Sequence, residues 1–144
     1  MIKILNIIFP IWFMYFYPMF WLIAIPANFI IDSIVLIVSM FILKINEKKK
    51  FYIRNIWKVF LFGFASDIIG SVLMFTFSCI FDLANPDSLY LTLPGLLISA
   101  GLIFIFNYFI SFRKIDKKQR LIFSLIFSII TAPYLFLIPM AWIY

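Results

Sequence analysis

Between Leu61 and Ser71 the chain reads LFGFASDIIGS, a run in which a single carboxylate, that of Asp67, interrupts apolar and small side chains. This run belongs to a longer apolar segment that extends from about Ile56 to Ile80. Segments of this length and composition are typical of transmembrane helices, and an ionisable side chain inside one is a candidate functional group because it is costly to keep there. We therefore predict a membrane span with an acid near its middle.

The composition of the whole chain also favours a membrane protein. Of its 144 residues 66% are hydrophobic and 12% are charged, whereas about a quarter of the residues of a soluble domain are charged. The apolar runs are continuous and lack the alternation of barrel strands, and no linker or repeat divides the chain. We predict an all-α integral membrane protein, with residues 1–144 forming one compact bundle of four to five transmembrane helices.

The boundaries of the spans follow from length and from proline. Residues 4–45 are almost unbroken apolar sequence, but one helix of that length would measure about 63 Å, about twice the hydrocarbon thickness, so we predict a break at Pro26. Eight aromatic residues and two prolines between Phe9 and Trp21 would also suit an interfacial or re-entrant segment, and both interpretations of the first span stay open. The predicted spans are residues 4–24, 28–45, 56–80, 95–112 and 121–144.

Basic residues predict how the bundle is oriented. The twelve Lys and Arg comprise Lys3, six residues from position 44 to 58 and five from position 113 to 120. The positive-inside rule places the basic loops 46–55 and 113–120 in the cytoplasm, and therefore the loop 82–94 and the C-terminus outside the cell membrane. We expect the basic loops to contact anionic lipid heads and expect no nucleic-acid partner.

The sequence argues against most enzyme chemistry. It has no histidine and one cysteine, Cys79, which removes the usual His/Cys metal sites and the Ser-His and Cys-His nucleophile pairs. We predict no metal site, no cofactor and no enzymatic activity.

Two carboxylates, Asp32 and Asp67, fall inside predicted spans that hold no Lys or Arg beside them. Such an acid is either protonated or holds a cation. Asn28 precedes Asp32 by one helical turn and Ser66 adjoins Asp67, so these four residues form the candidate ion or proton site. The helical rise puts the two acids about 8 Å apart in depth, which predicts two stations along a polar path and not a pair that shares a proton.

Small side chains at helical spacing predict where helices approach each other closely. On this interpretation Asp67 is neutral and donates a hydrogen bond across a helix interface, as an alternative to an ion site. The residues of the predicted helix-packing face are Gly63, Ser66, Gly70, Ser124 and Ser128.

Two classes of function remain open. The first is a cation- or proton-coupled transporter or channel subunit that uses the intramembrane carboxylates, and a bundle this small would be expected to form a homo-oligomer. The second is a non-transporting accessory, assembly or immunity-type subunit that binds a larger membrane protein. An intramembrane enzyme acting on lipid ranks below both, because the chain offers no convergent nucleophile and base.

Overall fold

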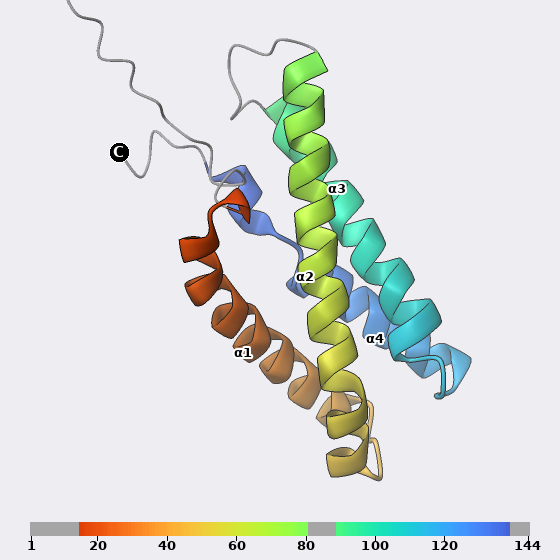
Figure 1. The fold of residues 1–144 in the computed structure, drawn as a ribbon. Helices are drawn as coiled ribbons and strands as arrows, with labels where there is room; N and C mark the ends of the chain where they lie inside the picture. The colour runs from red at the N-terminus through yellow and green to blue at the C-terminus, as the bar shows by residue number, and fades with distance from the viewer. Residues whose placement is uncertain (1–14, 81–88, 139–144) are drawn as a thin grey trace, which may run out of the picture.

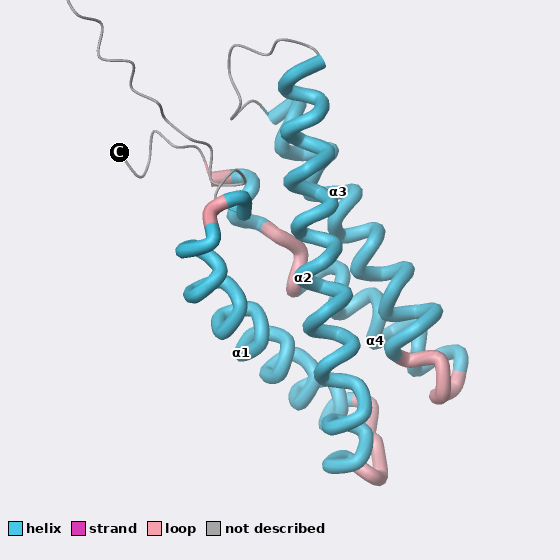
Figure 2. The backbone as a smooth tube through the Cα atoms, viewed as in Figure 1, coloured by secondary structure: helices cyan, strands magenta, loops and turns pink. Residues whose placement is uncertain are grey.

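The computed structural model describes residues 15–80 and 89–138, and every helix or turn of helix in them belongs to one bundle (Figures 1 and 2). In the described residues there is no strand. The elements are α1 (Pro18–Ile42), α2 (Lys48–Ile80), α3 (Leu89–Phe106), the π-helical turn η2 (Asn107–Ser111), α4 (Lys117–Ile130) and the 3₁₀ turn η3 (Tyr134–Leu137).

The predicted all-helical class is confirmed in the described residues, and four helical segments there are long and apolar enough to cross a membrane. They contain 25, 33, 23 and 21 residues, where the third combines α3 with η2 and the fourth combines α4 with η3. The 23 residues of the third segment reach about 35 Å as a helix, against a hydrocarbon core of about 30 Å.

The predicted break at Pro26 is wrong. Helix α1 runs through this proline, and Pro18 stands in its first turn, where a missing amide hydrogen costs nothing. Residues 18–24 of the first predicted span therefore belong to the same helix as residues 28–42. Helices of membrane proteins tolerate internal proline because neighbouring groups satisfy the freed carbonyl. Residues 1–14 lie outside the described residues.

Other helix boundaries also differ from the prediction. Helix α2 begins at Lys48 and α4 at Lys117, so most of the predicted basic loop 46–55 and half of the loop 113–120 belong to the first turns of a helix. Helix α3 begins at Leu89 and contains Pro94 in its second turn. Because proline lacks an amide donor, the sequence predicts kinks at Pro133 and Pro139 in the last span. The structure interrupts this span near Pro133, whereas Pro139 and the C-terminus lie outside the described residues.

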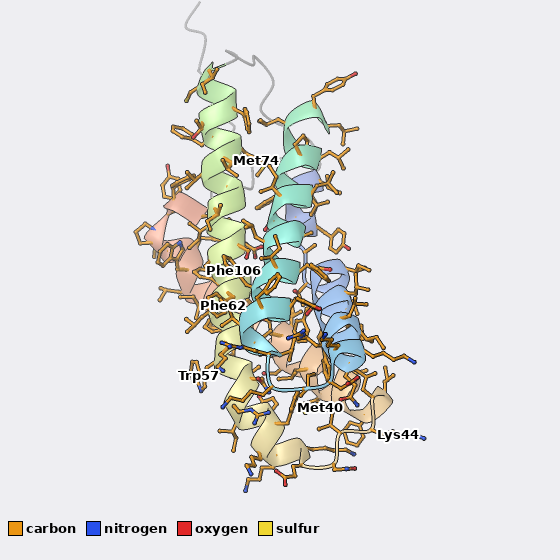
Figure 3. The ribbon with its side chains drawn as sticks, turned by 90° about the vertical axis from the view of Figure 1, so that its right-hand side faces the viewer. Met40, Lys44, Trp57, Phe62, Met74 and Phe106 are labelled. Carbon is orange, nitrogen blue, oxygen red and sulfur yellow. The ribbon has the colours of Figure 1, made fainter. Side chains whose placement is uncertain are left out.

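Helix α2 packs against both α1 and α3, and α3 packs in turn against α4. Small residues bring α2 and α3 together: a Cβ added to Gly70 would lie 3.2 Å from the Ser99 Cβ and 3.3 Å from the Gly95 carbonyl oxygen. Met74 fills the space beside Gly95 and lies between the two helices in Figure 3. Further along, Phe62 and Phe106 pack with ring centroids 5.1 Å apart, which extends this interface.

An aromatic core closes the end of the bundle that carries the basic residues. The rings of Phe112 and Phe123 stack with centroids 4.8 Å apart, and Phe51 lies 5.4 Å from Phe123. These rings come from the start of α2, the end of η2 and the first turns of α4, so they hold three segments together. The fully or nearly fully buried members of this core include Leu36, Val59, Ile103, Phe112, Phe123 and Phe127.

Both basic connections lie at the same end of the bundle, toward the bottom of Figure 1. The Gln119 side chain at the start of α4 donates to the Leu43 carbonyl at the end of α1, 3.5 Å away. This contact ties the α3–α4 connection to the α1–α2 connection.

Candidate functional site

A cavity of about 360 Å³ lies between α1, α2 and the interruption after α4. Helix α1 supplies Asn28 and Asp32, α2 supplies Gly63 and Asp67, and the remainder of the wall comes mainly from the segment that follows α4. The lining residues are Tyr15, Asn28, Ile31, Asp32, Gly63, Phe64, Asp67, Ile130, Thr131, Ala132, Pro133, Tyr134, Leu135 and Ile138.

Asp67 is buried and held by hydrogen bonds. Its side chain is only 4% exposed, and the Ser99 hydroxyl on α3 donates to its Oδ1 at 2.9 Å. The Tyr15 hydroxyl donates to its Oδ2 over a longer 3.4 Å. These contacts fix the direction of the carboxylate, so Asp67 joins α2 to α3 and to the segment before α1.

Asp32 is equally buried but has no such support. It is 4% exposed, and within the described residues its carboxylate has no hydrogen bond and no ion pair. Gly63 faces it from α2: a Cβ added there would lie 3.6 Å from Asp32 Oδ2. The absence of a side chain at Gly63 therefore leaves room beside this carboxylate.

The two acids line one cavity, although the sequence predicted separate stations along a path. The prediction placed Asp32 about five residues from a helix end at Asn28. Because α1 is continuous through Pro26, Asp32 instead lies in the second half of a 25-residue helix, deep enough to face the same space as Asp67. Two ionised carboxylates around one poorly solvated space repel each other, so a proton or a cation is needed to offset their charge.

Tyr15 is the site residue that sequence reasoning missed. Its ring is enclosed by Phe20, Phe64 and Phe136, with centroids 5.5, 6.1 and 6.0 Å away. The Trp21 indole donates to the Tyr15 carbonyl at 2.7 Å. The only sequence signal was its place in the aromatic run from Phe9 to Trp21, and aromatic residues near a helix end are equally typical of a membrane interface.

Asn28 lies at the same cavity and interacts with the Tyr15 phenol. One helical turn separates it from Asp32, as the sequence predicted from their spacing. Its side chain therefore offers an amide oxygen and an amide nitrogen beside the two acids.

The interrupted helix adds to the negative field of the cavity. Helix α4 ends at Ile130, and Thr131, Ala132 and Pro133 continue along the cavity wall, as the short loop after α4 in Figure 2 shows. The C-terminal end of a helix carries a partial negative charge from its carbonyl groups. Unwound segments of this kind supply carbonyl ligands for cations in transporters built from broken helices.

The charged side chains that line the cavity are acidic. It includes two carboxylates, and no lysine or arginine is among its described residues. Together with the helix end, the phenol and the amide, this arrangement attracts cations or protons and disfavours anions. The described residues contain no group of three or more His, Cys, Asp or Glu side chains that would hold a metal ion.

Comparisons with protein-family models, with curated proteins and with solved structures found no match to this chain.

The other predicted site residues lie away from the cavity. The Ser66 hydroxyl donates to the Phe62 carbonyl at 2.6 Å, and Ser66 is not among the lining residues. Ser124 and Ser128 are buried on α4 and donate to the backbone of their own helix, to Arg120 and Leu125. Of the predicted packing residues, Gly63 thus borders the cavity while Gly70 lies at the contact with α3.

A second group of buried polar atoms lies at η2, near the aromatic core. Neither polar atom of the Asn107 side chain has a hydrogen-bond partner within the described residues, nor do the Ser111 hydroxyl and Arg120 Nε. The Arg120 guanidinium does contact Tyr108, through a hydrogen bond of 3.3 Å and over the ring face. None of these residues lines the cavity.

Proposed function

We propose that this chain is a multi-pass protein of the cell membrane that takes part in cation or proton transport, as a carrier or as a channel subunit. On this proposal Asp32 and Asp67 bind the transported cation or proton in the cavity. The two basic connections face the cytoplasm and contact anionic lipid heads, and copies of the chain associate into a homo-oligomer.

The environment of Asp32 is the observation that carries the proposal. An acid at the centre of a membrane helix costs about 2.5 to 3.5 kcal/mol on insertion scales. Asp67 offsets part of this cost through the bonds from Ser99 and Tyr15, and such bonds alone would suit a structural role. In the described residues, Asp32 has no hydrogen bond or ion pair that would offset this cost. Its side chain lines a cavity of about 360 Å³. A bound proton or cation supplies the missing partner.

Flux measured in liposomes tests this proposal. The wild-type protein, reconstituted with a proton- or sodium-sensitive dye inside, should carry one of these ions down an imposed gradient. Asp32→Asn and Asp67→Asn keep the side-chain shape and remove the charge, so each should lower the flux at least tenfold. The Asn at position 67 still accepts the bond from Ser99, which keeps the fold intact.

Asp116→Asn is the matched control for these variants. Asp116 caps α4 by accepting from the Lys118 amide at 3.1 Å, and it is exposed. Asn caps a helix as well as Asp does, so this variant should transport as the wild type does. Flux that is unchanged in both cavity variants would overturn the proposal. A wild type with no flux for either ion, purified in a stable complex with another membrane protein, would favour the accessory function instead.

A further inference from the structure

The cavity is larger than an inorganic cation or a proton needs. Its volume is about 360 Å³, whereas one water molecule takes up about 30 Å³ in the liquid, so the space corresponds to on the order of ten waters. Small-molecule sites begin at about 300 Å³. The volume therefore fits a small organic molecule.

The wall of the cavity is mainly apolar and aromatic. Phe64, Tyr15 and Tyr134 supply aromatic groups, and most of the remaining lining is aliphatic. Sites that bind inorganic cations surround the ion with oxygen ligands, whereas aromatic rings beside carboxylates are what organic ammonium ions bind. The wall thus matches a ligand with a positive charge and an apolar body.

The mouth of the cavity opens on an apolar part of the bundle surface. Four lining residues are about half exposed, and they come from α1, from the last turn of α4 and from the segment that follows α4. They are Ile31, Ile130, Tyr134 and Leu135. Because this rim has no charged side chain, it suits contact with lipid chains, and a ligand that partitions into the bilayer reaches the acids through it.

We propose that the cavity binds a small organic cation with an apolar or aromatic body, which enters from the membrane. This proposal rests on the proposed transport function and adds an organic cation, as the substrate that occupies the cavity, to the proton or sodium ion whose flux that function predicts. The positive charge pairs with Asp32, and the apolar body contacts Phe64 and the segment after α4. A neutral lipid chain would leave Asp32 without a partner, and an anion would meet two carboxylates.

Benzyltrimethylammonium and neopentylbenzene test the proposal, because they share a shape and differ only in having nitrogen or carbon at the branched centre. Binding is measured by equilibrium dialysis against the purified full chain in lipid nanodiscs, with empty nanodiscs subtracted. The cation should bind saturably and the neutral probe should not. Asp32→Asn should weaken binding of the cation at least tenfold.

A variant that fills the cavity tests whether binding depends on the volume of the cavity as well as on the charge of Asp32. Gly63→Leu adds a side chain toward Asp32 and should abolish binding of the benzyl cation. Gly101→Leu is the matched control, because a Cβ added at Gly101 meets nothing within 4 Å. If Gly63→Leu fails to fold, Ile31→Trp narrows the mouth from an exposed position and should weaken binding at least tenfold.

Each negative result identifies which proposal fails. Equal partitioning of both probes, or binding that survives Asp32→Asn, would overturn the organic-cation site. If the benzyl cation does not bind while Asp32→Asn still abolishes proton or sodium flux, the transport function stands and this inference fails. If the cation binds in the expected manner but the wild type transports nothing, the site stands as a binding site and the transport function fails.

Discussion

Asp32 and Asp67 are buried to the same extent but differ in their partners, and this difference predicts opposite roles in stability. Asp32→Leu removes a carboxylate that has no hydrogen bond to the described residues, and it should raise the free energy of unfolding by about 1 to 3 kcal/mol, since a buried polar group without a hydrogen bond costs about that much. Asp67→Leu should raise the free energy of unfolding by less, or should lower it, because Ser99 and Tyr15 would lose their hydrogen-bond acceptor. Thermal unfolding in detergent at one pH shows which of the two variants is more stable.

If Asp32→Leu is more stable than the wild type but no longer carries protons or sodium ions in liposomes, Asp32 is a residue that serves function at the expense of stability. The opposite order, with Asp32→Leu less stable than Asp67→Leu, would mean that Asp32 has a structural partner.

The sequence was sufficient to single out Asp32 and Asp67, because an acid in an apolar run stands out at once. Helical spacing also placed Asn28 beside Asp32. Helical spacing did not predict that the two acids line the same cavity, because periodicity gives the face of one helix and not its depth relative to another. Tyr15 was missed for a related reason: its contact with Asp67 joins residues 52 positions apart in the chain, and no local pattern reports such a contact.

The contact between α2 and α3 depends on glycine. Two alanine substitutions distinguish the effect of close helix packing from the effect of the intrinsic helix propensity of alanine. Gly70→Ala should destabilise the protein by about 1 to 3 kcal/mol, as overpacking typically does, because the new methyl group would lie within 3.3 Å of Ser99, Gly95 and Phe136. Gly101→Ala meets nothing within 4 Å and should stabilise α3 by about 0.5 to 1 kcal/mol. The shift in midpoint of thermal unfolding measures both, and a Gly70→Ala variant as stable as Gly101→Ala would contradict the close packing.

Three of the described prolines, Pro26, Pro94 and Pro133, show why helix boundaries were harder to predict than helices. Pro26 and Pro94 lie inside helices, while the chain leaves its helix before Pro133. Because proline disfavours a helical conformation in the residue before it, the sequence predicted a break at Pro26 and a helix that begins after Pro94. What distinguishes the third is packing: after it, Phe136 turns inward to reach Gly70 and the Tyr15 ring. That contact is tertiary, so the sequence could give the position of the interruption but not its place at the cavity.

Taken as a whole, the bundle has an apolar outer surface and a partly polar interior, the reverse of a soluble protein. Large hydrophobic side chains on all four long helices are exposed, while Asn, Asp, Ser and Thr residues are buried. Lipid covers such a surface without cost, and interhelical contacts then rely on small residues and buried polar groups. The hydropathy of the sequence predicted this arrangement, because the arrangement depends on the composition of long segments and not on any single contact.

The positions of the two basic connections lead to a prediction about orientation. With Cys79, which is exposed, replaced by serine, single cysteines at Glu47 and Lys114 should react with a membrane-impermeant maleimide from the same side, because Gln119 ties these connections together. The positive-inside rule makes that side cytoplasmic, so both should react in inside-out vesicles and resist in intact cells. A cysteine at Leu89, at the opposite end of α3, should show the reverse pattern. Labelling of Glu47→Cys and Lys114→Cys from different sides would require an odd number of crossings between them, and the cavity formed by α1, α2 and the end of α4 would then not exist in the membrane.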